Sequence, residues 1–395
     1  MIGTAVTAHS TRSMSIAVLE VPFRVDFGPG LDEADVQRIT ASWSSCAGAP
    51  DDTALVVHAD VIVDGASRPS TGIRVHTRSV AQLEESLTST LTVEAIGVRR
   101  HDLLMLHACG MAAEDGRVLA FVAASGTGKT TIARALGTRF GYVTDETVGV
   151  TPTGRVLPYP KPLSVKPLTG SAPKAQLAPD SIGLRPIPKA PLVLAGVVLL
   201  DRREHVEVPR LEAVDPIEAI DLLVPQTSYL SARPRPLTDL VETLRGLGGV
   251  TRLVYSEATG ALDLVEAAFA TVAVDAPDAW NEILSLGLET PDAPVGGLLV
   301  RAPVDDAILL AGGELVVFCD NRLARLEGIG PALWHLTGEA ISADELVEAV
   351  VTSVGPAPEG VDARAAVSAA LVELMALGVI TRTPASAPTP DGVHA

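Results

Sequence analysis

Residues 118–130 read VLAFVAASGTGKT, an apolar run followed by a glycine-rich loop and the start of a helix. The apolar run Val118–Val122 is typical of a buried strand, and the following pattern predicts a helix over Thr130–Leu136. Residues 123–130 fit the phosphate-binding pattern A/G-x-x-x-x-G-K-S/T, with alanine first. Such glycines let successive backbone N–H groups surround phosphate oxygens, and the helix N-terminus adds partial positive charge. The stretch therefore predicts an α/β domain with a phosphate site.

The residues expected to bind the phosphates of a nucleotide are Ser125, Gly126, Thr127, Gly128, Lys129, Thr130 and Thr131. Lys129 would bridge the outer phosphates. The Thr130 hydroxyl is placed to coordinate Mg²⁺, which takes oxygen ligands and needs a nearby carboxylate to complete its site. The expected ligands are therefore ATP and Mg²⁺. The alternative is a glycine-rich turn that binds nothing.

Two acidic residues, Asp145 and Glu146, follow the short apolar strand predicted at Tyr142–Thr144. Neighbouring parallel strands have their carboxyl ends at one edge of the sheet, so we expect the acidic pair to meet the glycine-rich loop. One carboxylate would hold Mg²⁺ or activate an attacking hydroxyl group, which makes Asp145 a candidate for both the catalytic and the metal site. A solvated acidic turn is the alternative.

Other polar residues are weaker candidates. His107 ends the apolar run Leu103–Leu106, and we expect it either to support the site or to be structural. Asp201 ends a hydrophobic strand but is followed by charged residues, so it is second to Asp145 as a metal carboxylate. Lys161 and Lys166 could reach a phosphate or an acidic substrate, but solvated side chains are the default expectation for lysines.

The chain is predicted to be a multidomain α/β protein, because its pattern changes several times along 395 residues. Alternation over Val21–Phe27 predicts a strand, and capping boxes at Ser79 and Ser342 predict helix starts. The helix expected at Leu237–Leu247 would pack on the central sheet. The predicted parts are a small N-terminal α+β domain (1–95), a central domain (96–274), a linker (275–297), a C-terminal domain (298–382) and a disordered tail (383–395).

The charge excludes two classes of partner. Thirty basic and 48 acidic residues give a net charge of −18, which repels nucleic acid and anionic membrane surfaces. The most apolar stretch, Pro191–Leu200, is too short to span a bilayer, and we find no secretion signal. Cys46, Cys109 and Cys319 are far apart and odd in number, which predicts reduced, mostly buried thiols. We therefore expect a cytoplasmic protein.

The segment Leu103–Val150 resembles the catalytic core of HPr serine kinase and its relatives. The likeness lies in Leu106-His107-Ala108, the glycine-rich loop and the sequence GYVTDE at 141–146. It implies a kinase in which Asp145 is the metal-linked or base carboxylate, Glu146 replaces the family's second aspartate, and His107 fills the family's histidine position. Residues 192–196 lack the acid and arginine that the bifunctional enzymes have there, and their basic C-terminal signature is missing, so the resemblance implies a diverged kinase.

Residues 298–382 resemble the PqqD-like peptide-recognition domain, which is similar to a winged helix. The likeness lies in short strands, the sequence LWHL at 333–336 and a capped helix. It implies capture of the leader of a precursor peptide as an added strand. A DNA-binding winged helix is the alternative, but Asp362–Met375 contains only one basic residue, Arg364, where a recognition helix would need several.

Together these patterns predict an ATP-dependent kinase that phosphorylates a Ser or Thr hydroxyl group of a ribosomally synthesised precursor peptide. The catalytic residues would be Asp145, Glu146, His107 and Lys129. One alternative is a nucleotide-binding peptide scaffold that transfers no phosphoryl group, and another is transfer to a small molecule. A homo-oligomer is also possible.

Overall fold

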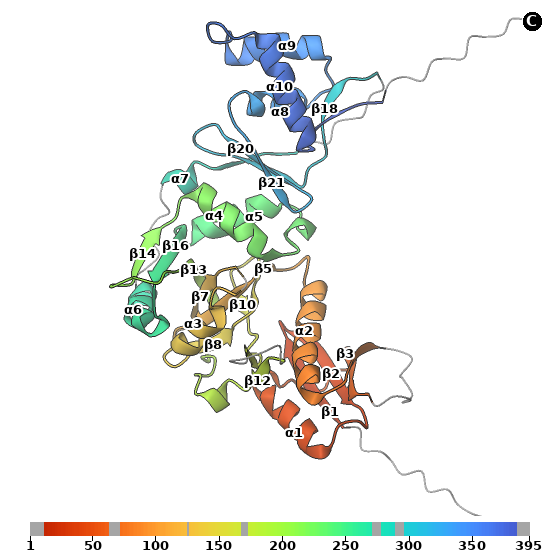
Figure 1. Cartoon of the computed structure of the whole chain (residues 1–395), viewed down its shortest axis with the longest axis vertical. Coiled ribbons are helices and arrows are strands. Elements are labelled where there is room, and N and C mark those ends of the chain that lie inside the picture. Colours follow the sequence, from red (N-terminus) through yellow and green to blue (C-terminus); the bar gives the residue numbers. More distant parts are fainter. Residues whose placement is uncertain are drawn as a thin grey trace, which may run out of the picture. The chain divides into compact units, whose positions relative to one another are not determined.

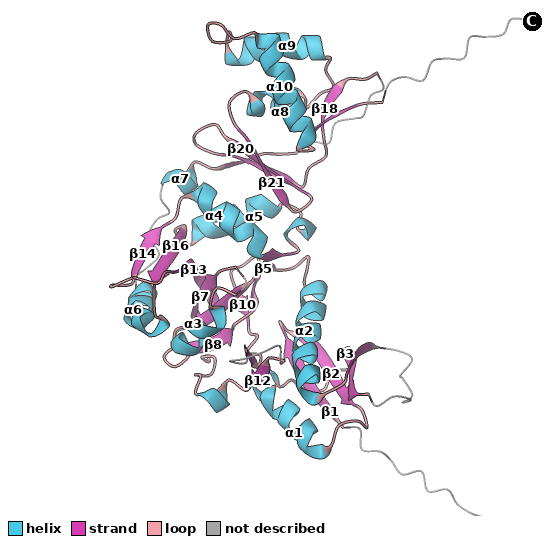
Figure 2. Cartoon of the chain, viewed as in Figure 1, coloured by secondary structure: helices cyan, strands magenta, loops and turns pink. Residues whose placement is uncertain are grey.

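A computed structural model of the chain describes residues 12–62, 72–124, 126–166, 173–270, 278–288 and 296–384. The predicted mixed α/β class is confirmed, with several separate sheets (Figures 1 and 2). The chain forms two compact units, one within residues 1–230 and 247–275 and the other within residues 231–246 and 276–395. Among the described residues, no helix combines the length and hydrophobicity needed to cross a membrane.

Parts of two predicted segments lie outside the described ranges, whereas the described residues 278–288 of the predicted linker contain a helix and a strand. The parts outside are residues 385–395 of the predicted tail and residues 275–277 and 289–295 of the predicted linker. Their predicted character stays a prediction.

The first unit is built on a six-stranded sheet in the order β14-β16-β13-β7-β6-β8. Its strands are β6 (Ala108–Ala112), β7 (Arg117–Val122), β8 (Gly141–Thr144), β13 (Val193–Arg202), β14 (Arg210–Ala213) and β16 (Val250–Tyr255). Strands β7, β13 and β16 are mutually parallel, whereas β6 is antiparallel to both β7 and β8. Consequently β7 and β8 point the same way and end at one edge of the sheet.

Strand β6 lies between β7 and β8 and is missing from the sequence prediction. Its sequence, ACGMA, has small side chains and little of the β-branched character that marks a strand. All five residues are nevertheless buried. A Cβ atom on Gly110 would lie only 3.0 Å from Val148 Cγ2 and 3.2 Å from Val143 Cβ, so the neighbouring chain packs directly on this glycine. Close packing, and not propensity, makes this segment a strand.

Further elements of the first unit surround this sheet. A small sheet has the order β10-β9-β5-β15, and β11 pairs with β12 as a hairpin. The bounds are β5 (Leu104–Leu106), β9 (Val148–Val150), β10 (Val156–Leu157), β11 (Leu163–Val165), β12 (Ala175–Leu177), β15 (Thr227–Ser228), α3 (Lys129–Leu136), α4 (Pro216–Leu223) and α6 (Leu262–Ala270).

The N-terminal part of the first unit is a four-stranded sheet with two helices, which we call the N-terminal layer. Its elements are β1 (Ser13–Val18), β2 (Val21–Phe27), β3 (Leu55–Val61), β4 (Ile73–Thr77), α1 (Glu33–Ser42) and α2 (Val80–Val98). Ser79 caps α2 by accepting a hydrogen bond from the Gln82 N–H. Helix α2 runs through residue 95, the predicted domain boundary. The core of the layer also includes Leu157 and Tyr159, so the layer and the following segments share one core.

The second unit contains a sheet in the order β17-β19-β20-β21 and the pair β18-β22, with five helices in its described part. Its elements are α5 (Pro236–Gly246), α7 (Asp278–Asn281), β17 (Leu284–Ser285), β18 (Leu299–Arg301), β19 (Asp306–Leu309), β20 (Leu315–Cys319), β21 (Arg322–Leu326), α8 (Gly330–Leu336), α9 (Ala343–Val354), α10 (Ala363–Ala376) and β22 (Ile380–Arg382). The capping box at Ser342 and Glu345 is confirmed.

Helix α5 belongs to the second unit, although its pattern predicts packing on the central sheet. The buried carboxylate of Asp306 on β19 accepts hydrogen bonds from the N–H of Thr238 at 2.8 Å and from its hydroxyl at 3.2 Å. This carboxylate satisfies donors in the first turn of α5, where a helix has no internal acceptors. An apolar helix face predicts burial but not the partner, which is why this expectation was wrong.

Candidate functional site

The glycine-rich loop (residues 123–130) joins β7 to α3 at the carboxyl edge of the central sheet. Gly126 and Gly128 have φ angles of +86° and +99°, a conformation that other residues adopt only with strain. Gly128 is the N-cap of α3 and has no side chain to cap it. The first N–H groups of α3 therefore face outward without an acceptor in the helix. Ser125, predicted to bind phosphate, lies outside the described residues.

Lys129 begins α3 and folds its side chain back over the loop. Its Nζ donates to the carbonyl oxygens of Ala123 at 2.5 Å and Ala124 at 3.3 Å. An ammonium group has three donors, so one is left for a phosphate. Burial lowers the pKa of Lys129, and the nearby acidic groups oppose that shift. The Thr127 hydroxyl also donates to Ala124, at 2.6 Å, so this predicted phosphate ligand is engaged within the loop.

Asp145 lies beside the loop, as the sequence predicts. The hydroxyl of Thr130 donates to Oδ2 of Asp145 at 3.1 Å, and the hydroxyl of Tyr142 donates to Oδ1 at 3.0 Å. The reason differs from the expected one, because β7 and β8 are not neighbours but are separated by the antiparallel β6. Two reversals of direction restore the same orientation, so both strands still end at one edge.

Lys161, for which the sequence favours a solvated side chain, lies at the site and is buried. Its side chain is only 1% exposed, and its Nζ lies 2.7 Å from Oδ1 of Asp145 and 3.4 Å from Oε2 of Glu146. Burial by itself lowers the pKa of Lys161, but Asp145 and Glu146 outweigh it and raise the pKa above its ordinary value. The expected solvated lysine is therefore wrong. The available signal was its position between Pro160 and Pro162 in an otherwise apolar segment.

Glu146 differs from Asp145 in its access to solvent. Its side chain is 32% exposed, whereas that of Asp145 is 2% exposed. The Glu146 N–H donates to the Thr144 hydroxyl at 3.2 Å, and its carbonyl accepts from the N–H of Ala108 at 3.1 Å. The acidic turn is thus fixed by its backbone, while the Glu146 carboxylate faces the cavity. This is the arrangement of a group that can meet a substrate.

His107 lies at the start of β6, at the same edge of the sheet. Its backbone N–H donates to the backbone carbonyl oxygen of Gln226 at 2.7 Å. Burial lowers the pKa of His107, with a further decrease from the charge of Lys129. The imidazole is therefore neutral at neutral pH, and it can both donate and accept a hydrogen bond. Cys109, two residues later, is completely buried, and burial raises the pKa of its thiol well above the usual value, as expected for a core residue.

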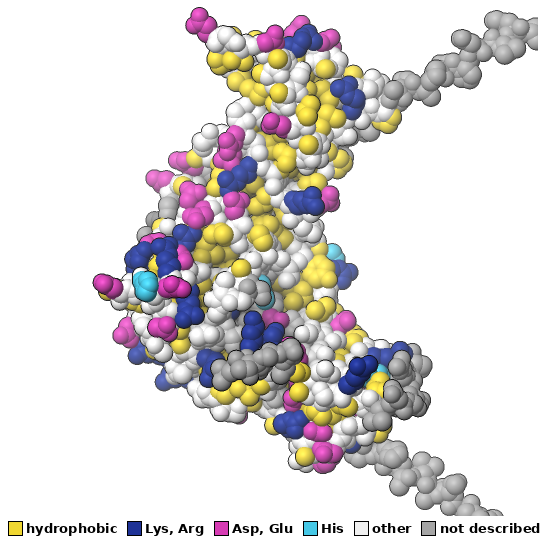
Figure 3. Space-filling model, in the orientation of Figure 1, with side chains coloured by type: hydrophobic (Ala, Val, Ile, Leu, Met, Phe, Trp, Pro, Cys, Tyr) yellow, Lys and Arg dark blue, Asp and Glu magenta, His cyan; other side chains and the backbone are white. Residues whose placement is uncertain are grey.

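A cavity of about 460 Å³ connects these groups, a volume within the usual range for small-molecule sites. The predicted site residues that line it are His107, Gly126, Gly128, Lys129, Thr130, Thr131, Asp145 and Glu146. Basic, acidic and histidine side chains lie close together near the middle of one face (Figure 3). Although the net charge of the protein is −18, this site contains both basic and acidic side chains.

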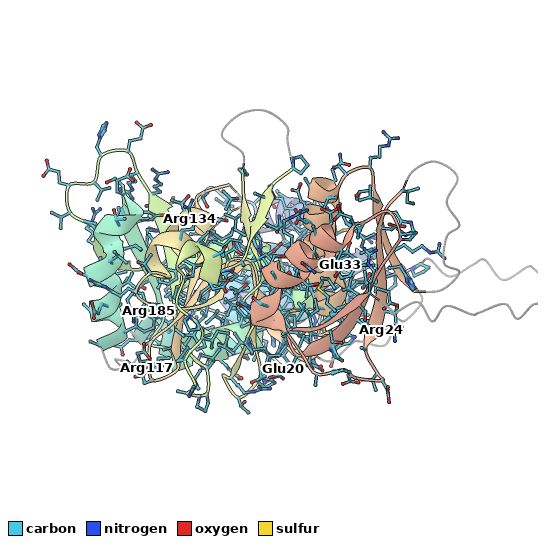
Figure 4. All side chains as sticks on the ribbon, turned by 90° about the horizontal axis from the view of Figure 1, so that it is seen from below. Glu20, Arg24, Glu33, Arg117, Arg134 and Arg185 are labelled. Carbon is cyan, nitrogen blue, oxygen red and sulfur yellow. The ribbon has the colours of Figure 1, made fainter. Side chains whose placement is uncertain are left out.

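The opposite wall of the cavity comes from α2 and from the β11–β12 hairpin. It includes Glu85, Thr88, Ser164, Lys166 and Lys174. Arg134 on α3 also lines the cavity and lies on the same side of the unit as the hairpin (Figure 4). Helix α2, most of which lies in the predicted N-terminal domain, therefore forms part of this wall.

The donor set fits Mg²⁺ held jointly with phosphate. Within the described ranges, no group of three or more His, Cys, Asp or Glu side chains could hold a metal by itself. Magnesium, however, binds through one or two protein oxygens together with phosphate oxygens. The oxygens of Thr130 and Asp145 are 3.1 Å apart, close to the ~3 Å between adjacent ligands of an octahedral ion with bonds of about 2.1 Å.

Asp201, the second candidate for a metal carboxylate, does not belong to this set. It is absent from the lining of the cavity and pairs with Arg203 at 2.6 Å. The hydrogen bonds from Arg203 lower the pKa of Asp201. Asp201 therefore forms a surface ion pair, as the charged residues after it suggest.

Comparison with known proteins gives no family for the chain. No family model matches the sequence, and no curated protein matches it. The assignment of this site therefore rests on its geometry.

Proposed function

We propose that the protein is a kinase that transfers the terminal phosphoryl group of ATP to a hydroxyl group. The observation that carries this proposal is the meeting of Thr130 with Asp145 beside the glycine-rich loop. A metal-binding hydroxyl and a carboxylate, placed next to a helix N-terminus and a lysine, are the parts that phosphoryl transfer requires. The resemblance to HPr serine kinase supports the same reaction.

The loop and Lys129 would hold the phosphates of ATP. The backbone N–H groups at the start of α3 donate to phosphate oxygens, and the remaining donor of Lys129 reaches the outer phosphates. Thr130 and Asp145 are the residues that would hold Mg²⁺, which neutralises phosphate charge when bound. Catalysis then depends mainly on positioning and charge neutralisation.

Glu146 is the better candidate for the group that accepts the proton of the acceptor. Both oxygens of Asp145 already have partners, Lys161 and Tyr142 on Oδ1 and Thr130 on Oδ2. The Glu146 carboxylate is partly exposed in the cavity. The sequence pattern offers Asp145 for both the metal and the base role, whereas this assignment leaves Asp145 with the metal and gives the base role to Glu146. The acceptor oxygen bonds to the γ-phosphorus, the bond from that phosphorus to the bridging oxygen breaks, and the acceptor proton goes to Glu146, leaving ADP and a phosphoester.

The acceptor that we propose is a Ser or Thr residue of a ribosomally made precursor peptide. The support is the second unit, whose sheet ends in the edge strand β21 and carries three helices that follow it, α8, α9 and α10. An extended leader peptide can add to a sheet edge through backbone hydrogen bonds. Docking of the leader would raise the local concentration of the core peptide to roughly the mM range.

The test combines the full chain with MgATP and a precursor peptide encoded beside its gene, and measures peptide mass. The expected result is the addition of one phosphate, lost in Lys129→Ala. Removing the leader from the peptide should raise KM and leave kcat little changed. Tight nucleotide and peptide binding with no mass change would instead favour a nucleotide-binding scaffold, and turnover of a small hydroxyl compound would favour a small-molecule kinase.

A further inference from the structure

The buried ammonium group of Lys161 has no part in the transfer steps above, yet it lies behind both acidic residues. It bonds Oδ1 of Asp145 and also lies 3.4 Å from Glu146. The Tyr142 hydroxyl shares Oδ1, so this oxygen is held from two sides. The second oxygen, Oδ2, is thereby turned toward Thr130 and the loop.

The segment that carries Lys161 is attached to the N-terminal layer by buried polar contacts. Before the lysine, the Tyr159 hydroxyl lies 2.5 Å from the hydroxyl of Thr92 on α2. After it, the Ser164 hydroxyl donates to Oε1 of Gln176, which also accepts from Thr88 on α2. These contacts fix the chain on both sides of Lys161.

The buried core of the layer also includes Cys46 together with Tyr159, two residues before Lys161. The Nζ of Lys161 also donates to the carbonyl oxygen of Pro162 at 3.1 Å. The ammonium group thus has fixed partners on several sides, and its position has little freedom.

We propose that Lys161 is a positioning residue of the phosphoryl-transfer site and that contacts with the N-terminal layer hold its segment in place. Its ammonium holds Asp145 with Oδ2 toward Thr130, the orientation that binds Mg²⁺ with the nucleotide. It also offsets the repulsion between the adjacent carboxylates of Asp145 and Glu146. This role rests on the proposed function, and it makes the N-terminal layer an integral part of the site. Partners of metal ligands typically change metal affinity or activity by about 10- to 100-fold when removed.

The test compares Lys161→Met, Lys161→Arg and the matched surface control Lys189→Met in the full chain. Mn²⁺ affinity in the presence of ADP is measured by electron paramagnetic resonance, with kcat, KM and the melting temperature alongside. Lys161→Met should lower Mn²⁺ affinity and kcat by about 10- to 100-fold, while ADP affinity without metal, which the loop sets, stays unchanged. Lys161→Arg should recover part of the loss, because it retains the cation, and Lys189→Met should resemble the wild type.

A folded Lys161→Met variant with wild-type Mn²⁺ affinity and kcat overturns the proposal, as does Lys161→Arg with no recovery. If Lys161→Met fails to fold, the Mn²⁺ affinity of Tyr159→Phe tests the proposal instead, because this variant removes only the hydrogen bond between Tyr159 and Thr92. A reduced Mn²⁺ affinity then supports the role of Lys161, and an unchanged one overturns it. Wild-type protein that binds Mn²⁺ and ADP but phosphorylates nothing contradicts the kinase function alone, whereas wild-type protein that binds neither overturns both proposals.

Discussion

The ammonium group of Lys161 lies 2.7 Å from Oδ1 of Asp145, and both side chains are almost completely buried. A buried ion pair of this kind contributes less than its Coulomb attraction suggests, because both charges have lost their hydration. Removing one partner of such a pair is nevertheless strongly destabilising, because the other charge then remains buried without a partner.

Lys161→Met should lower the free energy of unfolding by about 3–5 kcal/mol, because it leaves the Asp145 carboxylate buried without its cation. Urea denaturation of the variant and of wild type measures the difference. The double variant Lys161→Met with Asp145→Asn should recover much of the loss, since no uncompensated charge remains. Equal stabilities of the single and double variants would contradict this account.

Lys129→Ala should weaken nucleotide binding by about 10- to 150-fold, the range that corresponds to one charge-assisted hydrogen bond of about 1.5–3 kcal/mol. Isothermal titration calorimetry with ADP measures the dissociation constant. Lys189→Ala, at an exposed position outside the cavity lining, is the control. Similar dissociation constants for wild type and Lys129→Ala would show that the glycine-rich loop does not hold phosphates.

Asp145→Asn and Glu146→Gln should affect different properties, the first the Mg²⁺ dependence of nucleotide binding and the second the rate of transfer. Asp145→Asn should remove the dependence of nucleotide affinity on Mg²⁺, because it removes a charged metal ligand. Glu146→Gln should retain that dependence and lower kcat by about 10²- to 10⁴-fold, the usual contribution of a general base. Nucleotide titrations with and without Mg²⁺, together with steady-state rates, separate the two. The reverse pattern would return the proton-accepting role to Asp145.

His107 should make the folded protein less stable in mild acid. Its pKa is lowered by burial and by Lys129, so between that pKa and the ordinary value of 6.5 the unfolded chain binds the proton and the folded chain does not. Stability therefore falls as pH falls through this window. Melting temperatures from pH 7.5 to 5.5 should show a smaller decrease for His107→Gln than for wild type. An identical decrease would assign the effect to other groups.

Asp306→Ala should destabilise the second unit by about 1–3 kcal/mol, because it leaves buried donors of Thr238 without an acceptor. Hydrogen exchange should increase in α5 in particular. Asp344→Ala, on the exposed surface of α9, is the matched control for loss of an acidic side chain in the same unit. Unchanged exchange in α5 would mean that Asp306 does not hold this helix.

Much of the site could be predicted because its parts follow one another in the sequence. The strand, the glycine-rich loop and the helix are contiguous, and the acidic turn follows on the next predicted strand, so local pattern alone indicated that Thr130 and Asp145 would meet. Lys161 could not be found in this way. Nothing adjacent to it shows that its side chain turns inward, and its partners become neighbours only when the chain after β10 passes behind the acidic turn.

The sequence by itself determined the α/β class, the glycine-rich loop between a strand and a helix, and the starts of the capped helices, because periodicity, glycine placement and capping residues act over a few positions. The tertiary structure decided where β6 is inserted, which unit holds α5, and that α2 of the N-terminal layer forms a wall of the cavity. These outcomes depend on which buried surfaces and which buried charges satisfy one another. A local pattern predicts that a side chain is buried or paired, but the residues that it contacts are brought together only in the folded chain.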